Sequence, residues 1–431
     1  MAGPSPASAP PPGVFDPRVF ARGVPHEEFR RLRDTVPVCW QPETEVLGWP
    51  AGPGYWAVTR YADVRHVLRT PEVYSSWLGA TQIRDPDPGD LDFIRRMILN
   101  MDPPEHNRLR RIVTAAFTRR RLERLTDQVT ERARALLAPA VAAGRCDLPA
   151  EVTDDFPLAN LSDLLGVPEA DRHLLLRWTN RVIGYQDPEH AELVTDAGGR
   201  PVNPRSPAAL ADMFSYARSL AADKRRHPAD DLMTALASAS VAGRSLDDAE
   251  LAMFFFLLVI AGNDTVRSAL PGGVLALAQH PQAYRRLSAS PGLLPGAIEE
   301  MLRWHPPVLS FRRTASQHTE LAGQAIRRGD KVVVYHVSAH YDERAFADPF
   351  RFDITRQPND HLAFGQGPHL CLGAHFARLQ LRAFFTELLR LAPRVELDGE
   401  PVRLTSNFIN GLTHLPVGFP ARQAGHRSSF K

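Results

Sequence analysis

The stretch that decides the fold of this 431-residue chain runs from Phe364 to Gly373 and reads Phe-Gly-Gln-Gly-Pro-His-Leu-Cys-Leu-Gly. It holds Cys371, one of three cysteines, and leads into Gly373–Leu391, whose apolar spacing predicts a helix. A thiolate that binds a metal needs hydrogen-bond donors and positive potential around it. A glycine-rich loop at a helix N-terminus supplies both, because its backbone can turn tightly and direct N–H groups at the sulfur. The glycines expected to do this are Gly365, Gly367 and Gly373.

Two simpler interpretations of this loop account for part of the pattern. A lone cysteine is most often a small, inert, buried side chain. A glycine-rich turn can also bind a dinucleotide, but that site would have a third glycine where Leu370 stands and a strand directly before the loop. Neither interpretation explains the whole pattern, including His369 two residues before the cysteine.

The loop resembles the cysteine signature of the cytochrome P450 family, Phe-x-x-Gly-x-x-x-Cys-x-Gly, and every element is present. The resemblance implies that Cys371 binds the iron of a haem b, with Phe364, Gly365 and Gly373 beside the cofactor. A thiolate ligand pushes electron density onto haem iron and favours O–O cleavage. The family takes its O2-dependent monooxygenase chemistry from this ligand.

A second motif, Ala261-Gly262-Asn263-Asp264-Thr265, lies in a helix predicted from about Ser245, whose hydroxyl would cap it, to about Leu270. A glycine inside a helix costs about 1 kcal/mol relative to alanine, so Gly262 indicates close approach of another group. From the residues alone, Thr265 can equally bond to its own helix, and Asp264 can face solvent or pair with Arg267.

The family resemblance implies specific roles for this second motif. Ala261 and Gly262 would open a groove beside the iron. Thr265 would hold the bound dioxygen and its water, and Asp264 would relay protons inward. Thr265 and Asp264 are therefore the candidate catalytic residues.

Two further motifs concern the scaffold and the haem carboxylates. Glu300 and Arg303 are three residues apart on one helical face, where an exposed pair would contribute only about 0.2–0.5 kcal/mol. The resemblance implies instead a buried structural pair that ties this helix to the segment before the cysteine loop. The haem propionates need cationic or strong donor partners. By the same resemblance these are His106, Arg110, Arg313 and His369, although each arginine alone would be a solvated charge.

The family's substrate pocket maps onto the Ser75–Leu99 region, the Phe254–Gly262 face, Val308–Phe311 and Asn407–Ile409. These stretches are rich in apolar residues, so we expect an apolar pocket for a small apolar substrate. Most of the residues could equally belong to the core. The pocket candidates are Trp77, Leu78, Ile94, Leu258, Val308, Leu309, Phe311, Phe408 and Ile409.

The segments Leu257–Thr265 and Ser406–Leu412 look like those of actinobacterial enzymes that hydroxylate steroids, terpenoids or other lipids. A tailoring step on a polyketide or peptide natural product is an alternative. So are a peroxide-using or non-oxygenating haem-thiolate enzyme of the same fold, and a non-enzymatic haem-binding protein. The acid–alcohol pair argues against the peroxide-using enzyme, and no Gly-x-Ser-x-Gly motif supports a hydrolase.

An arginine-rich run is usually a solvated helix face, but the family resemblance gives it a second interpretation as a docking surface. The chain has no reductase domain of its own, so we expect electrons from NAD(P)H to arrive through a ferredoxin reductase and an acidic ferredoxin. Electrostatic attraction to such a face mainly raises the association rate. The arginines concerned are Arg108, Arg111, Arg119, Arg120 and Arg121.

Composition is consistent with one cytoplasmic domain. Hydrophobic residues make up 44% and the formal net charge is +2, which gives no reason to expect nucleic acid as a partner. The three cysteines lack the spacings of disulfide frameworks or zinc sites, and no apolar run is long enough for a membrane anchor. We expect a monomer, mainly α with a small β portion. Residues 14–420 would form a single cytochrome P450 domain between a flexible lead-in, 1–13, and a flexible tail, 421–431.

Overall fold

The computed structural model describes residues 13–420 except 48, 184, 185, 188–193, 195–202, 205 and 242. The predicted lead-in therefore lies outside the described residues apart from Gly13, and the predicted tail lies wholly outside them. Within the described part, the prediction of a mainly helical fold with a small β portion is confirmed.

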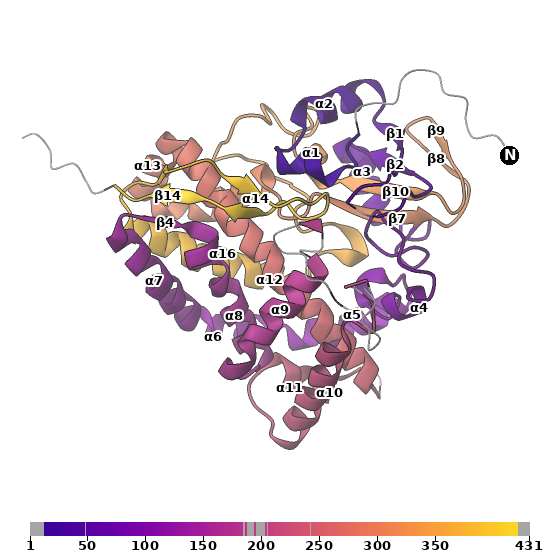
Figure 1. Cartoon of the computed structure of the whole chain (residues 1–431), viewed down its shortest axis with the longest axis horizontal. Helices are drawn as coiled ribbons and strands as arrows, with labels where there is room; N and C mark the ends of the chain where they lie inside the picture. The colour runs from indigo at the N-terminus through magenta and orange to yellow at the C-terminus, as the bar shows by residue number, and fades with distance from the viewer. Residues whose placement is uncertain are drawn as a thin grey trace, which may run out of the picture.

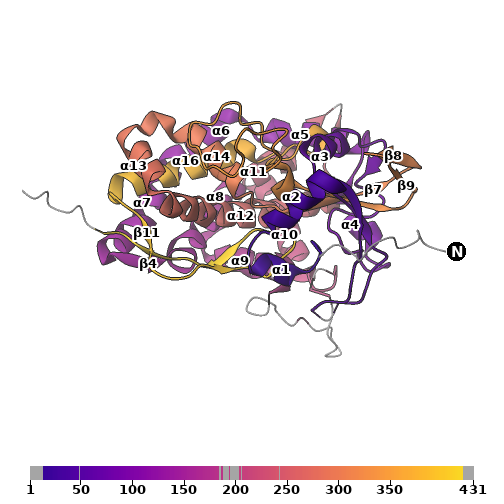
Figure 2. The ribbon, with the colours of Figure 1, turned by 90° about the horizontal axis from the view of Figure 1, so that it is seen from above.

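Helices form most of the molecule, and they surround α12, which crosses its centre in both views (Figures 1 and 2). The helices are α1 (Pro17–Ala21), α2 (His26–Thr35), α3 (Tyr61–Arg69), α4 (Leu91–Ile94), α5 (Glu105–Ala116), α6 (Arg119–Arg124), α7 (Thr126–Ala143), α8 (Asp155–Leu165), α9 (Arg172–Ile183), α10 (Ala211–Arg226), α11 (Leu232–Ser238), α12 (Asp248–Gln279), α13 (Pro281–Ala289), α14 (Leu294–Trp304), α15 (His336–Ala339) and α16 (Ala374–Leu391).

The strands gather mainly in one five-stranded sheet of order β1-β2-β10-β7-β3. Strands β1 and β2 form an antiparallel pair, and β10 runs parallel to β2 and antiparallel to β7. The strands are β1 (Val38–Gln41), β2 (Tyr55–Val58), β3 (Tyr74–Ser75), β4 (Arg145–Asp147), β5 (Ser240–Val241), β6 (Arg244–Ser245), β7 (Ser310–Ala315), β8 (Thr319–Leu321), β9 (Gln324–Ile326), β10 (Lys331–Tyr335), β11 (Glu396–Leu397), β12 (Val402–Arg403), β13 (Leu412–His414) and β14 (Pro416–Gly418).

Both ends predicted for the central helix were wrong. Helix α12 is capped by Asp247, whose carboxylate accepts from the backbone N–H of Glu250 at 2.8 Å, while Ser245 belongs to strand β6. The helix also continues beyond Leu270, through Pro271, to Gln279. Every residue from Ser268 to Leu277 is buried, so packing supports the helix across the proline, and a Cβ at Gly272 would lie 2.2 Å from the His305 ring.

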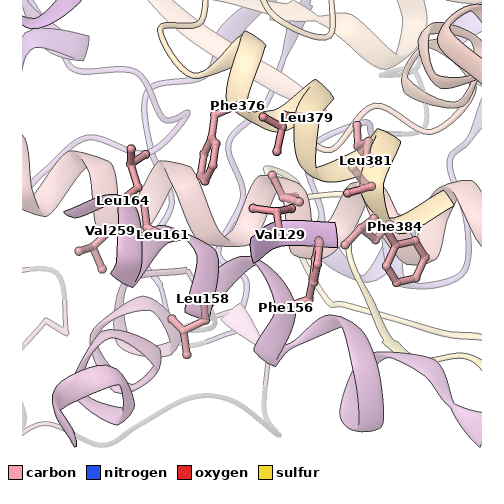
Figure 3. Packing of buried hydrophobic residues seen from close by; sticks show 14 of the residues in the cluster. Val129, Phe156, Leu158, Leu161, Leu164, Val259, Phe376, Leu379, Leu381 and Phe384 are labelled. Atoms are coloured by element: carbon pink, nitrogen blue, oxygen red, sulfur yellow. The ribbon is translucent and has the colours of Figure 1, made fainter. Parts of the chain in front are cut away.

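The core is built where α12 meets α7, α8 and α16 (Figure 3). Phe376 and Phe384 on α16 and Leu161 on α8 pack in one buried cluster with Val259 of α12. Among the described residues, α12 is the one helix long and apolar enough to cross a membrane. Because 56% of its most apolar window is buried inside the structure, we assign it as a core helix.

Glu300 and Arg303 of α14 form an ion pair with both side chains fully buried, N–O distances being 2.8 Å. Arg303 also donates to the carbonyls of His340 and Pro349 at 2.8 and 2.9 Å. Glu300 accepts from the Arg356 guanidinium at 3.1 Å. Removing one partner of such a buried pair typically costs about 3–5 kcal/mol. The pair thus fixes α14 to the segment that leads into the cysteine loop.

Candidate functional site

One large cavity lies between α12, α5, β7 and the cysteine loop. Its empty volume is about 1550 Å³, open solvent at its mouth included. Of the three cysteines, Cys39 and Cys146 are buried elsewhere, and Cys371 is the one whose side chain reaches the cavity.

Two of the three loop glycines are required by the backbone. Gly365 and Gly367 have φ angles of +70° and +72°. A Cβ at Gly367 would also lie 2.4 Å from the carbonyl oxygen of Leu68, so any side chain there collides with α3. The third, Gly373, has a φ of −84° and no protein atom within 4 Å of a Cβ, so the turn itself does not require glycine there, although its backbone does bond to the Cys371 sulfur as expected. Gly373 borders the cavity, so the space beside it is left for a ligand.

The surroundings of the Cys371 sulfur combine enclosure with positive potential. Enclosure by the protein raises the pKa of the thiol, while a hydrogen bond from the Gly373 backbone and the charges of Arg110 and Arg378 lower it. The loop itself is closed by a hydrogen bond of 2.8 Å from the Cys371 N–H to the Phe364 carbonyl. These donors and cations are what a metal-bound thiolate needs.

The four residues expected at the propionates all border this cavity: His106, Arg110, Arg313 and His369. The rings of His106 and His369 lie 4.3 Å apart between centroids. Arg313 is buried, and desolvation lowers its pKa to about 10. Among the described residues, no carboxylate lies within ion-pair distance of Arg110 or Arg313, and Asp102 acts on Arg313 from farther away, so this end of the cavity has an excess of positive charge. A dianionic ligand such as haem fits that donor set.

Ala261, Gly262 and Thr265 of α12 border the cavity opposite the cysteine loop. The Thr265 hydroxyl donates to the Ala261 carbonyl at 2.8 Å, so the local hydrogen bond considered from the sequence is present. A Cβ at Gly262 would lie 3.0 Å from Leu161, which shows that close packing against α8 is one reason for the glycine.

Asp264 points away from the main cavity and is buried. Its carboxylate lies 3.5 Å from the Arg267 guanidinium, so the pairing with Arg267 considered from the sequence is present and exposure to solvent is not. Burial raises the pKa of Asp264 to about 7, with Arg267 acting in the opposite direction and Asp154 in the same direction.

Three of the nine pocket candidates, Leu258, Val308 and Phe311, border the cavity. The other six candidates do not border the cavity. Leu309 belongs to the core cluster under the sheet, Ile409 borders a separate small pocket, and Phe408 packs on the Phe311 ring at 5.5 Å. Trp77 and Leu78 are about 40% exposed, and Ile94 does not border the cavity either.

Several residues at or near the site were missed. Ile98, Leu99 and Leu257 border the cavity and lie within the predicted Ser75–Leu99 and Phe254–Gly262 stretches, but they were not among the nine named candidates. Arg356 binds Glu300 from 56 positions away, a long-range partnership that sequence spacing cannot reveal. His340 accepts from the Leu362 N–H at 2.8 Å and so links the Arg303 network to the loop.

Comparison with known proteins agrees with this geometry. A family model described as Cytochrome P450 matches residues 292–403. Over 394 residues, 90% of each chain, the protein is 42% identical to a methyl-branched lipid omega-hydroxylase of Mycobacterium tuberculosis. It is 37% identical to a steroid C26-monooxygenase of the same species over 96% of this chain and 94% of that protein. The chain belongs to the cytochrome P450 family.

A solved cytochrome P450 of Mycobacterium marinum, in complex with pseudoionone, has the same architecture. It is 38% identical and aligns with a TM-score of 0.82 over 96% of this chain and all of that one. As a P450, the protein is a haem-thiolate monooxygenase that uses O2.

Substitution of Gly367 tests the loop geometry. In Gly367→Ala the new methyl group meets the Leu68 carbonyl, so we expect most of the haem to be lost on purification and a lower thermal midpoint. Gly144→Ala is the matched control, because Gly144 has a φ of +79° but open space beside it, and it should cost only about 1 kcal/mol. Haem content by absorbance and thermal unfolding measure both; equal behaviour of the two variants would contradict the steric argument.

Proposed function

We propose that this P450 hydroxylates the terminal carbon of an apolar, methyl-branched chain on a steroid or other lipid, with Cys371 as the iron ligand and a ferredoxin as electron donor. The observation that carries the proposal is the continuity of one cavity from the Cys371 side chain to the apolar residues of α12 and β7. The unpaired cysteines support a cytoplasmic enzyme, and we propose that it acts as a monomer.

The names of the two relatives support the choice of reacting carbon. One is an omega-hydroxylase of methyl-branched lipids and the other oxidises C26, a carbon at the end of the steroid side chain. Leu257, Leu258, Val308 and Phe311 border the cavity and offer no hydrogen-bonding side chain. Such a surface holds a hydrocarbon end by shape and exclusion of water.

The overall reaction converts a C–H bond, O2, two electrons and two protons into an alcohol and water. Haem with a thiolate ligand, when bound, supplies activation of dioxygen and insertion of one oxygen atom. Arg110, Arg313, His106 and His369 would hold the haem carboxylates at the cation-rich end of the cavity.

The proton-handling residues lie on α12. The Thr265 hydroxyl borders the cavity and donates its proton to the Ala261 carbonyl, so its Oγ1 is free to accept a hydrogen bond from a water there; rotation of the side chain would redirect the proton to dioxygen or to that water. Asp264, whose pKa of about 7 lets its carboxyl group both take and release a proton near neutral pH, would supply protons to Thr265 from the other side of the helix. This acid–alcohol pair supports monooxygenation over the peroxide-using alternative.

The first experiment joins a spectrum to a product assay. The purified protein, reduced and exposed to carbon monoxide, should show the red-shifted Soret band of thiolate-ligated haem, and Cys371→Ala should lose it. Supplied with reductase, ferredoxin and NADH, the wild type should hydroxylate a methyl-branched fatty acid or a sterol side chain at its terminal carbon, as identified by mass spectrometry. Product at internal positions only would overturn the regiochemistry, and a histidine-type band would overturn Cys371 as the ligand.

Replacing the alcohol on α12 tests its role. In Thr265→Ala the cavity keeps its apolar lining but loses the hydroxyl, so we expect NADH oxidation to continue while product per NADH falls at least several-fold and peroxide accumulates. Thr265→Ser, which keeps the hydroxyl, should retain most of the coupling. Equal coupling in wild type and Thr265→Ala would refute the assignment.

Of the five arginines in this run, we propose that Arg111 and Arg120 contact the ferredoxin. Arg108 is paired with Glu105 and Glu250, whereas Arg111 and Arg120 are exposed. The side chain of Arg119 lies outside the described residues, and Arg121 donates to the Ala116 carbonyl. Arg110, which precedes Arg111 on α5, donates to the carbonyl of exposed Leu370 next to Cys371, which supports a docking face near the iron ligand.

Charge reversal tests this face. Arg111→Glu and Arg120→Glu should slow ferredoxin-supported reduction about tenfold or more at low salt, with the difference shrinking as ionic strength rises. Arg22→Glu, an exposed arginine beside α1, is the control and should reduce at the wild-type rate. Stopped-flow formation of the carbon monoxide complex measures the rates; unchanged rates in both variants would place the docking surface elsewhere.

A further inference from the structure

Three polar side chains near the cysteine loop form a connected group, although none of them borders the large cavity: His361, Glu299 of α14 and Arg378 of α16. The Arg378 guanidinium donates to both oxygens of Glu299, each at 2.7 Å. The Nε2 atom of His361 lies 3.0 Å from the same carboxylate. A two-point pair of this kind fixes the orientation of the guanidinium as well as its distance. None of the roles assigned above uses this group.

His361 ties the Glu299 carboxylate to the segment that leads into the cysteine loop. Its Nδ1 accepts from the backbone N–H of Ala363 at 3.2 Å, so the neutral ring carries its proton on Nε2 and donates it to Glu299. The His361 side chain is buried. Glu299 is therefore held on two sides, by the helix that follows the loop and by the segment that precedes it.

Arg378 brings a positive charge close to the Cys371 sulfur. Its guanidinium carbon lies 4.3 Å from the centre of the Phe364 ring, and Phe364 is the first residue of the loop and borders the cavity. The hydrogen bonds to Glu299 and, as a smaller effect, the charge of Cys371 raise the pKa of Arg378. Arg110 is the other cation that acts on the sulfur, and it is assigned to the haem carboxylates. Arg378 has no such assignment.

A fixed cation beside a thiolate ligand makes the iron easier to reduce. Reduction adds one negative charge to the iron and its ligands, and a positive charge nearby stabilises that added charge. Groups around a metal ligand, rather than the ligand alone, adjust the reduction potential of haem iron. The Glu299 carboxylate acts in the opposite direction, but it lies behind the guanidinium and its effect at the sulfur is weaker.

We propose that Arg378, oriented over Phe364 by Glu299 and His361, sets the reduction potential of the iron bound by Cys371. The step concerned is the transfer of one electron from the ferredoxin, which is oxidised, to ferric iron, which becomes ferrous; no bond breaks and no proton moves. Arg378 acts on this step through the Cys371 sulfur and is a positioning residue, as are Glu299 and His361. The inference rests on the proposed role of Cys371 as the iron ligand.

Two substitutions that break the same pair should shift the potential in opposite directions. Arg378→Met removes the cation, so at a fixed applied potential the ratio of ferrous to ferric iron should fall about threefold or more. Glu299→Gln removes the anion but keeps an acceptor for Arg378, so the same ratio should rise. Loss of structural support alone would move both variants the same way.

Two further variants serve as controls. Arg378→Lys keeps the positive charge without the two-point pair, and its potential should lie between those of wild type and Arg378→Met. Arg390→Met removes an arginine from the same helix, α16, where Arg390 is half exposed and paired with Glu387. Its potential should equal that of wild type.

Spectroelectrochemical titration of the haem-loaded proteins measures these potentials without turnover. The shifts should shrink as ionic strength rises, because Arg378 and Glu299 are partly exposed. Shifts in the same direction, or none, in variants that keep the thiolate-type carbon monoxide band would overturn the inference and leave the proposed function intact. If Arg378→Met does not retain haem, Glu299→Gln decides: a rise in the ratio supports the inference, and a fall or no change overturns it. Opposite shifts in a protein that makes no lipid product would support the inference while the proposed substrate fails. A histidine-type band in the wild type would overturn both.

Discussion

The buried network around Arg303 is the constraint on which the site depends. Its guanidinium pairs with Glu300 and also donates to backbone carbonyls of the 340–349 segment, while Glu300 accepts from the backbone of Asp353 at 2.9 Å and from Arg356. The chain from 340 to 362 has little regular secondary structure to hold it. Charge-assisted bonds to a fixed helix therefore replace it, and they set where the cysteine loop begins.

Helix α12 separates two spaces of opposite character. Its Leu258, Ala261 and Thr265 side faces the large apolar cavity, while Asp264, Arg267 and Ser268 face a small polar pocket. Asp264 and Thr265 are adjacent in sequence but face different environments, because successive helical side chains point about 100° apart. The arrangement lets the substrate side exclude water while the acid stays within reach of it.

Sequence predicted the parts of this protein whose chemistry is local. The cysteine loop, the acid–alcohol pair and the helix after the loop follow from short spacings, and Gly367 was expected to be required for a backbone reason. Predictions failed where distant packing decides. Helix α12 continues through Pro271, where every residue from Ser268 to Leu277 is buried, while Trp77 is exposed and Leu309 lies in the core under the sheet. Arg356 binds Glu300 from 56 positions away, and the small pocket beside Asp264 joins α9, α12 and the 404–413 segment, contacts that no local pattern predicts.

The electrostatics of the large cavity connect folding with cofactor binding. Arg313 is 3% exposed, and its positive charge has no carboxylate partner within ion-pair distance among the described residues. Asp102 acts on this charge from farther away and the guanidinium donates to the Arg312 carbonyl at 2.8 Å, but burial of a cation without an ion-pair partner is still unfavourable. Because a ligand that binds only the folded state stabilises it, the haem carboxylates would offset the cost of Arg313 and Arg110 at the moment of binding. The positive charge at this end of the cavity does not stabilise the polypeptide by itself. Its presence therefore supports the binding of an anionic cofactor.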